Sequence, residues 1–397
     1  MGELTRGLGV RAAALLSMIA AAVLGVIAMI KPLSEPFYAV LAASFLQGRL
    51  DVSLQRYDVS VFQDHAFYAM GPLPSVLLMP VVAVLGQAIP NTFVGIPAVL
   101  ACLPALNRIL RTLEVDPRDT GWWKIAAIAG TPLLAYAALD SGYFAAGVVV
   151  VAFLSWALAL ALEGRQPLLV GFLVGLAAAT RADAAFAIIP LVLMARQRGA
   201  RFRDPGLMLA GLAPAILFLA AYNQARFGSP FESGYAYQRL VNPWLDDARR
   251  YGLISIQHLP KNLFFLLLAG PVPAGGSYAP VLKWPWLVPD PWGTSAFLIS
   301  PWLVLAFWAR GRRAGLMVLG VVLVLLPSLF YYGIGWIQFG YRYGLDALPF
   351  AWVLAVLGAQ RLGLGGRRLV AFVVAAMVVN LWGALWLVRL WGQAFYS

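Results

Sequence analysis

The chain has 397 residues, of which 61% are hydrophobic and only 12% are charged. Soluble domains carry about 25% charged residues, so this composition excludes a soluble globular enzyme, a disordered chain and a secreted disulfide scaffold. The apolar residues suffice for about twelve helices of the ~20 residues that span a bilayer. A transmembrane β-barrel is excluded as well, because its strands alternate in polarity. We therefore expect an all-α polytopic membrane protein.

The net charge of +12 comes largely from short basic loops between apolar runs. This pattern is typical of cytoplasmic loops and gives no reason to expect a nucleic-acid partner. The single cysteine, Cys102, excludes a disulfide within the chain. The apolar stretch after Arg11 is too long for a signal peptide and has no convincing cleavage site, so we expect a retained first span.

The apolar runs predict one membrane domain over 1–397, a bundle of about 11–12 transmembrane helices. The expected helices lie near 10–30, 70–88, 92–110, 122–139, 142–162, 167–180, 184–195, 206–222, 294–309, 314–331, 346–360 and 368–389. Loops with clustered arginines should be cytoplasmic; they surround Arg6, Arg198, Arg312 and Arg367. The segment 31–69 is then the first extracytoplasmic loop, and 223–293 is a second such loop with an interfacial part. The expected location is the inner (plasma) membrane.

Near the start of the chain, the number of predicted helices disagrees with the expected sides of the membrane. Ala69 is expected outside and Arg108 inside, which allows one crossing, yet two helices are predicted between them. Prolines such as Pro72 and Pro80 interrupt the 70–88 segment, and proline disturbs helices. Either this segment does not cross fully, or another part of the first outer loop dips into the membrane.

The first outer loop carries acids among aromatic residues. Glu35 lies at the mouth of the first span and opens a short amphipathic helix that is expected to run to Gly48. A carboxylate there is either functional or a favourable charge at a helix start. Asp58 follows in the same loop.

Asp140 interrupts an apolar run where two spans are expected to meet outside, and Arg181 and Asp183 share a tight turn. Ionisable groups at membrane depth are costly and are usually paired or functional. One interpretation is an ion pair of Arg181 with Asp183 or Asp140 that staples helices. The other is a site for a charged lipid headgroup and a hydroxyl acceptor, because an arginine fork suits phosphate and a carboxylate can take the proton of an attacking hydroxyl.

Two more arginines, Arg226 and Arg342, lie among aromatic residues and glycines at the outer ends of spans, the second beside Tyr343. They are either phosphate ligands or basic anchors that reach the interface. No P-loop, Rossmann glycine pattern, metal-ligand helix motif or serine elbow is present. Tryptophan is expected at any membrane–water boundary, so we assign no chemistry to the cluster Trp284, Trp286 and Trp292.

The order of these features resembles the GT-C integral-membrane glycosyltransferases, which include protein O-mannosyltransferases and lipid A aminoarabinose transferases. Their first outer loop begins with Asp-Glu-x-x-Tyr-Ala and ends in a tyrosine before a proline-rich helix start. The corresponding residues here are Ser34-Glu35-Pro36-Phe37-Tyr38-Ala39, Tyr68 and Gly71-Pro72-Leu73. Asp140 and Thr180-Arg181 match a later acidic residue and a Thr-Lys/Arg turn of the family. Ser34 replaces the usual aspartate, and Gly71 stands where aminoarabinose transferases have lysine.

This resemblance implies transfer of one monosaccharide from a polyprenyl-phosphate carrier to a glycan, lipid or protein acceptor, with inversion, on the extracytoplasmic side. Glu35 is then the expected base, with Asp58 or Asp140 as the alternative base or as an orienting group. The donor phosphate is expected on Arg181 and Arg342, with Arg226, and the pocket beside Tyr38, Tyr68 and Tyr343. Arginine can stabilise the leaving phosphate, so no cofactor is required, while a divalent metal at the acidic cluster stays open.

A polytopic transporter or a flippase for lipid-linked sugar is the alternative. It predicts charges near the bilayer midplane and paired short helices interrupted by glycine or proline. The polar groups of this chain gather on one expected face instead, which favours an enzyme. A purely structural subunit would not need Asp140 and Arg181 at depth.

Overall fold

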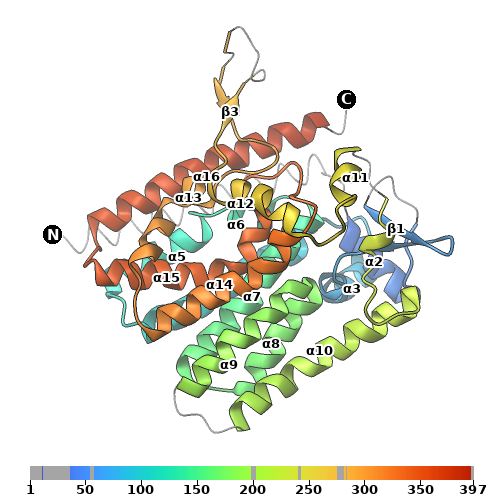
Figure 1. Cartoon of the computed structure of the whole chain (residues 1–397), viewed down its shortest axis with the longest axis horizontal. Helices are drawn as coiled ribbons and strands as arrows, with labels where there is room; N and C mark the ends of the chain where they lie inside the picture. The colour runs from blue at the N-terminus through green and yellow to red at the C-terminus, as the bar shows by residue number, and fades with distance from the viewer. Residues whose placement is uncertain are drawn as a thin grey trace.

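The computed structural model describes residues 11, 36–53, 58–197, 203–239, 243–274, 281–282 and 284–394. Over these residues the chain is mostly helical (Figure 1). Its α-helices are α2 (Phe37–Leu46), α3 (Leu73–Leu85), α4 (Thr92–Thr112), α5 (Pro117–Ile128), α6 (Leu133–Ala138), α7 (Gly142–Glu163), α8 (Pro167–Thr180), α9 (Ile188–Gln197), α10 (Arg203–Phe227), α11 (Pro243–Arg249), α12 (Leu259–Leu267), α13 (Ala296–Ile299), α14 (Arg312–Phe330), α15 (Leu348–Arg361) and α16 (Arg367–Ala394).

Short 3-10 helices and two small hairpins complete the described part of the fold. The 3-10 helices are η1 (Ala182–Ala187), η2 (Tyr235–Tyr237), η3 (Ile256–His258), η4 (Pro301–Trp308) and η5 (Arg342–Ala347). The hairpins pair β1 (Val59–Phe62) with β2 (His65–Tyr68), and β3 (Val272–Pro273) with β4 (Leu287–Val288), both antiparallel.

Within the described ranges, six segments are long and apolar enough to cross a membrane by length and composition. They are α4, α7, α10, α14, η5 together with α15, and α16. The expectation of an all-α membrane protein is thereby confirmed. The expected span at 10–30 lies outside the described residues, apart from Arg11.

Two expected spans are broken rather than continuous. The segment at 122–139 divides into α5 and α6 at Pro132, because proline has no N–H to continue the helical ladder. The segment at 294–309 divides into α13 and η4 at Pro301. The two breaks face each other: Ser300 Oγ and Trp302 Nε1 donate to the Gly130 carbonyl at 2.7 and 3.1 Å. These bonds satisfy a carbonyl that the interrupted helix leaves without a helical partner.

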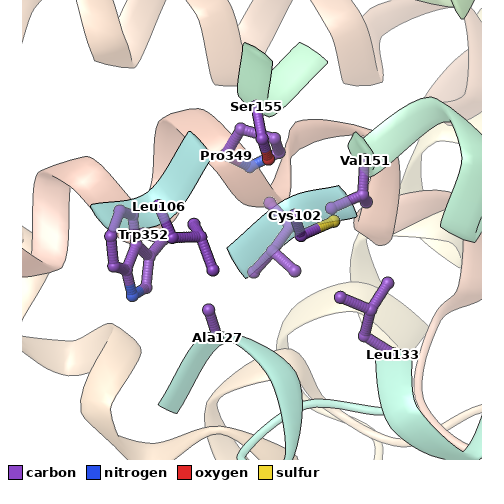
Figure 2. Close-up of a pocket in the computed structure, with 9 residues that line it drawn as sticks. Cys102, Leu106, Ala127, Leu133, Val151, Ser155, Pro349 and Trp352 are labelled. Atoms are coloured by element: carbon purple, nitrogen blue, oxygen red, sulfur yellow. The ribbon is translucent and has the colours of Figure 1, made fainter. Parts of the chain in front are cut away.

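The core is centred on α7, which is buried along nearly its whole length. This follows from its sequence, because a helix that is apolar on every side is stable only when it is surrounded. Figure 2 shows side chains of α4, α5, α6, α7 and α15 around a void of about 10 Å³, among them Cys102, Val151 and Trp352. Such a void holds about one water at most, so the core is closed.

The conflict in the helix count is explained by α3. This helix has 13 residues, or about 20 Å at 1.5 Å per residue, which is shorter than the ~30 Å hydrocarbon layer. Gly71, before α3, packs against the Thr180 carbonyl at the end of α8. Asn91, before α4, bonds to Asp140 just before α7. Because α7 and α8 form a helical hairpin, both points lie at one end of the bundle, and α3 does not cross.

The helix in the first loop differs from the expected amphipathic one. Six of the ten residues of α2 are buried, including Phe37, Tyr38 and Leu41, and α2 packs against α3, β2 and the start of α7. The second extracytoplasmic loop was expected to begin at residue 223, but helix α10 continues to Phe227. The hairpin strands β3 and β4 project away from the helices in Figure 1.

Candidate functional site

One end of the bundle contains a cavity of about 930 Å³. We call this the cavity end; α7 and η5 begin there, and α8, α10 and α14 end there. The volume is in the usual range for ligand pockets, ~300–1,000 Å³. Of the nine residues expected to act as base, phosphate ligand or pocket wall, six line the cavity: Tyr38, Asp58, Arg181, Arg226, Arg342 and Tyr343. Asp183 lines it as well.

Asp58 presents a clamped carboxylate to this cavity. It lies in the turn before β1 with φ of 59°, in the left-handed region, which aspartate tolerates better than most residues. Tyr143 Oη donates to Asp58 Oδ2 at 2.5 Å, and Gln238 Nε2 donates to Oδ1 at 3.1 Å. Burial raises the pKa of the Asp58 carboxyl, and the Tyr143 hydrogen bond and the Arg342 charge partly offset that rise.

Arg181 lies between two carboxylates at the end of α8. Its Nε is 2.9 Å from Asp346 Oδ2 and 4.0 Å from Asp183 Oδ1, and the Asp346 side chain is completely buried. Asp183 Oδ2 also accepts a hydrogen bond from Ser328 Oγ at 2.8 Å. The staple interpretation was therefore right about Asp183 as a neighbour, but the closer counterion is Asp346. Two carboxylates compensate the one charge of Arg181.

Arg342 has a different environment, although it lines the same cavity. Its guanidinium lies over the rings of Tyr143 and Tyr343, 4.6 and 5.2 Å from their centroids. Its Nη2 donates to Tyr343 Oη at 3.3 Å. No carboxylate of the described residues forms an ion pair with it. A cation held by aromatic faces in a cavity is available to an anion.

Arg226 is only 5% exposed and is held by neutral groups. Its Nη1 donates to the Tyr68 carbonyl at 2.6 Å, and its Nη2 donates to Asn223 Oδ1 at 2.8 Å. The guanidinium stacks over Tyr222 at 3.8 Å. Arg226 thus ties α10 to the end of β2 while bordering the cavity. Tyr68 is itself buried and does not line the cavity.

Asp140 is not part of the cavity wall. It is buried, and its Oδ1 accepts from the backbone N–H of Asn91 at 2.7 Å and from Asn91 Nδ2 at 2.8 Å. The carboxylate thereby satisfies an amide at the start of α4, where helices leave N–H groups without helical partners. The expected convergence of Asp140 with Arg181 on one cavity is not found. Glu35, the expected base, lies outside the described residues.

Sequence reasoning missed several residues of the cavity end. Tyr143 and Gln238 hold Asp58, yet each is an ordinary residue of an aromatic or polar stretch. Asp346 gave the same signal as Asp140, an acid next to an apolar run, and was passed over. Trp336 also lines the cavity. Within the described ranges, no group of three His, Cys, Asp or Glu side chains is placed to hold a metal ion.

Comparison with known proteins found no matching family model, no matching curated protein and no matching solved structure.

Proposed function

We propose that the chain is a membrane glycosyltransferase of the GT-C type that uses a polyprenyl-phosphate monosaccharide. The observation that carries the proposal is a single cavity that holds both a clamped carboxylate, Asp58, and a cation without an ion pair among the described residues, Arg342. Those are the groups that a hydroxyl acceptor and a phosphate leaving group require. The resemblance of the first loop and of the Thr180-Arg181 turn supports the same reaction.

The donor phosphate is assigned first to Arg342. A guanidinium can bind two phosphate oxygens with two parallel hydrogen bonds. Arg342 can do so without first breaking an ion pair with a carboxylate of the described residues. Arg181 is the second phosphate ligand, with its charge shared by Asp346 and Asp183. Arg226 contributes positive charge from the wall of α10.

The reaction is an inverting displacement at the anomeric carbon. A carboxylate removes the proton of the acceptor hydroxyl while the oxygen of that hydroxyl forms a bond to the anomeric carbon. The bond from the carbon to the phosphate oxygen breaks, and its electron pair leaves with polyprenyl phosphate, which gains one negative charge beside the arginines. Among the described residues the cavity is lined by two carboxylates, Asp58 and Asp183. Asp58 is assigned as the base because Asp183 lies beside Arg181; Glu35 is the base that the resemblance implies. Tyr38 and Tyr343 border the same space.

The proposal also specifies the membrane that holds the enzyme and the side of that membrane to which the cavity opens. The basic loops around Arg312 and Arg367 lie away from the cavity end, at the other ends of α14 and α15. Under the positive-inside rule the cavity then opens to the extracytoplasmic side of the inner membrane. In a GT-C bundle of about 11–12 helices, the broken pairs α5 with α6 and α13 with η4 each count as one crossing.

The test is reconstitution of the full chain in lipid nanodiscs, with binding of a radiolabelled short-chain polyprenyl phosphate as the readout. Arg342→Gln should weaken binding about 10- to 100-fold, because hydrogen bonds to a charged group contribute ~1.5–3 kcal/mol. Arg250→Gln is the matched control, since Arg250 is 79% exposed and outside the cavity.

Transfer is tested with donors that carry different sugars. Transfer to any glycan, lipid or protein fraction of the cell envelope supports the proposal. Unchanged binding by Arg342→Gln contradicts the phosphate assignment. Movement of the lipid-linked sugar across a vesicle membrane, with no transfer, would assign the chain to the flippases instead.

A further inference from the structure

Two tryptophans form part of the cavity wall. Trp292 and Trp336 both line the cavity, and their ring centroids are 4.3 Å apart with planes inclined at 57°. Trp336 is 42% exposed, so much of its indole is uncovered. Trp284 and Trp286, which come just before β4, do not line the cavity. The tryptophans that sequence analysis grouped together therefore occupy two different environments.

Gln338, which is completely buried, bonds to the backbone of Trp292 and of the segment just before Trp336. Its Nε2 donates to the carbonyls of Trp292 and Ile334 at 2.6 and 2.8 Å, and its Oε1 accepts from the Arg342 backbone N–H at 3.2 Å. Gly335, with φ of +95°, passes so close that a Cβ there would lie 2.6 Å from Gln338 Oε1. One side chain thus joins the tryptophan pair to the segment that carries Arg342.

This arrangement suits the ring of a sugar. A sugar ring has a face of C–H groups and an edge of hydroxyls, and an indole offers a large, flat apolar surface to such a face. Two polar groups lie beside Trp292, although neither lines the cavity: Lys261 Nζ is 5.9 Å from the Trp292 ring, and the Asp290 carboxylate accepts from the Trp292 N–H at 2.9 Å. An exposed tryptophan, which has only two side-chain torsions, also loses little conformational freedom when a ligand stacks on it.

We propose that Trp336, supported by Trp292, is a platform on which a sugar ring stacks, in a subsite distinct from the arginines that hold phosphate. The tryptophan pair is the evidence for this subsite. Only the identity of the sugar that occupies it rests on the proposed function. That sugar is either the one carried by the donor or one at the end of a glycan acceptor.

The experiment separates these sources with two kinds of ligand. The full chain in nanodiscs is titrated with polyprenyl phosphate that carries mannose, glucose or arabinose, and with sugar-free polyprenyl phosphate. Methyl glycosides of the same sugars are examined by saturation-transfer NMR. The variants are Trp336→Ala and Trp336→Phe, and the matched control is Trp284→Ala, since Trp284 is 75% exposed outside the cavity.

For a donor sugar, Trp336→Ala should bind the best sugar-bearing lipid about tenfold more weakly, with binding of the sugar-free lipid unchanged. For an acceptor sugar, both lipids should bind normally and the NMR signal of at least one methyl glycoside should be lost. Trp336→Phe keeps an aromatic face and should lose less in either case, which provides a second measurement if the alanine variant does not fold.

The proposal is overturned if Trp336→Ala and Trp336→Phe bind every lipid and glycoside as the wild type does. It is also overturned if the wild type binds no glycoside and does not prefer any sugar-bearing lipid. Failure of the proposed function is distinguishable: sugar stacking on Trp336 would then be observed without transfer, whereas failure of the platform alone leaves Arg342-dependent phosphate binding and transfer intact.

Discussion

Asp58 and Asp140 are both acids in largely apolar surroundings, and burial raises the pKa of each. The two carboxylates differ in whether open space lies next to them. Asp140 is enclosed, and Asn91 supplies two donors to one of its oxygens. Asp58 has donors from Tyr143 and Gln238 but also borders the 930 Å³ cavity. Burial of an acid therefore does not by itself indicate chemistry; open space next to the carboxylate does.

The same comparison applies to the two arginines of the cavity. Arg181 is neutralised by Asp346 and Asp183, whereas Arg342 lies on tyrosine rings. Removing Arg181 leaves the buried Asp346 carboxylate without its counterion. Removing Arg342 leaves no carboxylate of the described residues without a partner, but it takes away the cation that an anionic ligand would bind. Predictions about these four residues therefore divide into effects on turnover or binding and effects on stability.

The largest expected effect is on turnover. Asp58→Asn should lower the transfer rate by ~10²–10⁴-fold, the usual contribution of a general base, because the amide keeps the size of the side chain but cannot take a proton. Asp51→Asn is the matched control, since Asp51 pairs with Arg49 and His65 at the surface. Glu35→Gln is assayed in parallel. Full transfer by Asp58→Asn together with an inactive Glu35→Gln variant would identify Glu35 as the base.

The next effect is on folding. Arg181→Ala should lower the free energy of unfolding by ~3–5 kcal/mol, because it leaves Asp346 buried and uncompensated. Thermal unfolding of the detergent-solubilised protein measures this change, and the double variant Arg181→Ala with Asp346→Asn should recover part of the loss. If Arg181→Ala unfolds at the wild-type temperature, the stabilising role of Arg181 is contradicted, and loss of polyprenyl-phosphate binding in that variant would leave only its role as second phosphate ligand.

A smaller effect is expected at Asp140. Asp140→Ala leaves the two Asn91 donors without their acceptor and should cost ~1–3 kcal/mol of stability. Asp140→Asn keeps a carbonyl oxygen in the same place and should cost much less, and transfer should persist in both variants once they are folded. Loss of transfer in a stably folded Asp140→Asn variant would return Asp140 to the reacting groups.

The smallest effect is a pH dependence of stability. Burial raises the pKa of Asp140 in the folded protein, with the Asn91 hydrogen bonds acting in the opposite direction. A raised pKa means that the folded state binds the proton more tightly than the unfolded state, whose carboxyl has a pKa of ~3.9. This contribution is complete below that value and is lost as pH rises through the folded pKa. The unfolding temperature of the wild type should therefore fall relative to Asp140→Asn between acid and neutral pH. Parallel curves for the two proteins would contradict the prediction.

The sequence by itself determined the membrane class and most of the helices. Long apolar runs have few alternatives to a buried or lipid-facing helix, and so α4, α7, α8 and α14 lie close to their expected bounds. The breaks at Pro132 and Pro301 were not anticipated, because the runs around them remain apolar. The irregular helix at 70–88 could be suspected from its prolines, but only its packing showed that it does not cross.

The tertiary structure decided which polar residues share a site. Asp140 and Asp346 look alike in sequence, as acids beside apolar runs, yet one bonds to the start of α4 and the other pairs with Arg181. Arg181 and Arg342 also look alike, and only their neighbours across the bundle distinguish a neutralised charge from an available one. Partners from distant segments, such as Tyr143 and Gln238 around Asp58, leave no local pattern, because their proximity depends on how helices pack rather than on spacing along the chain.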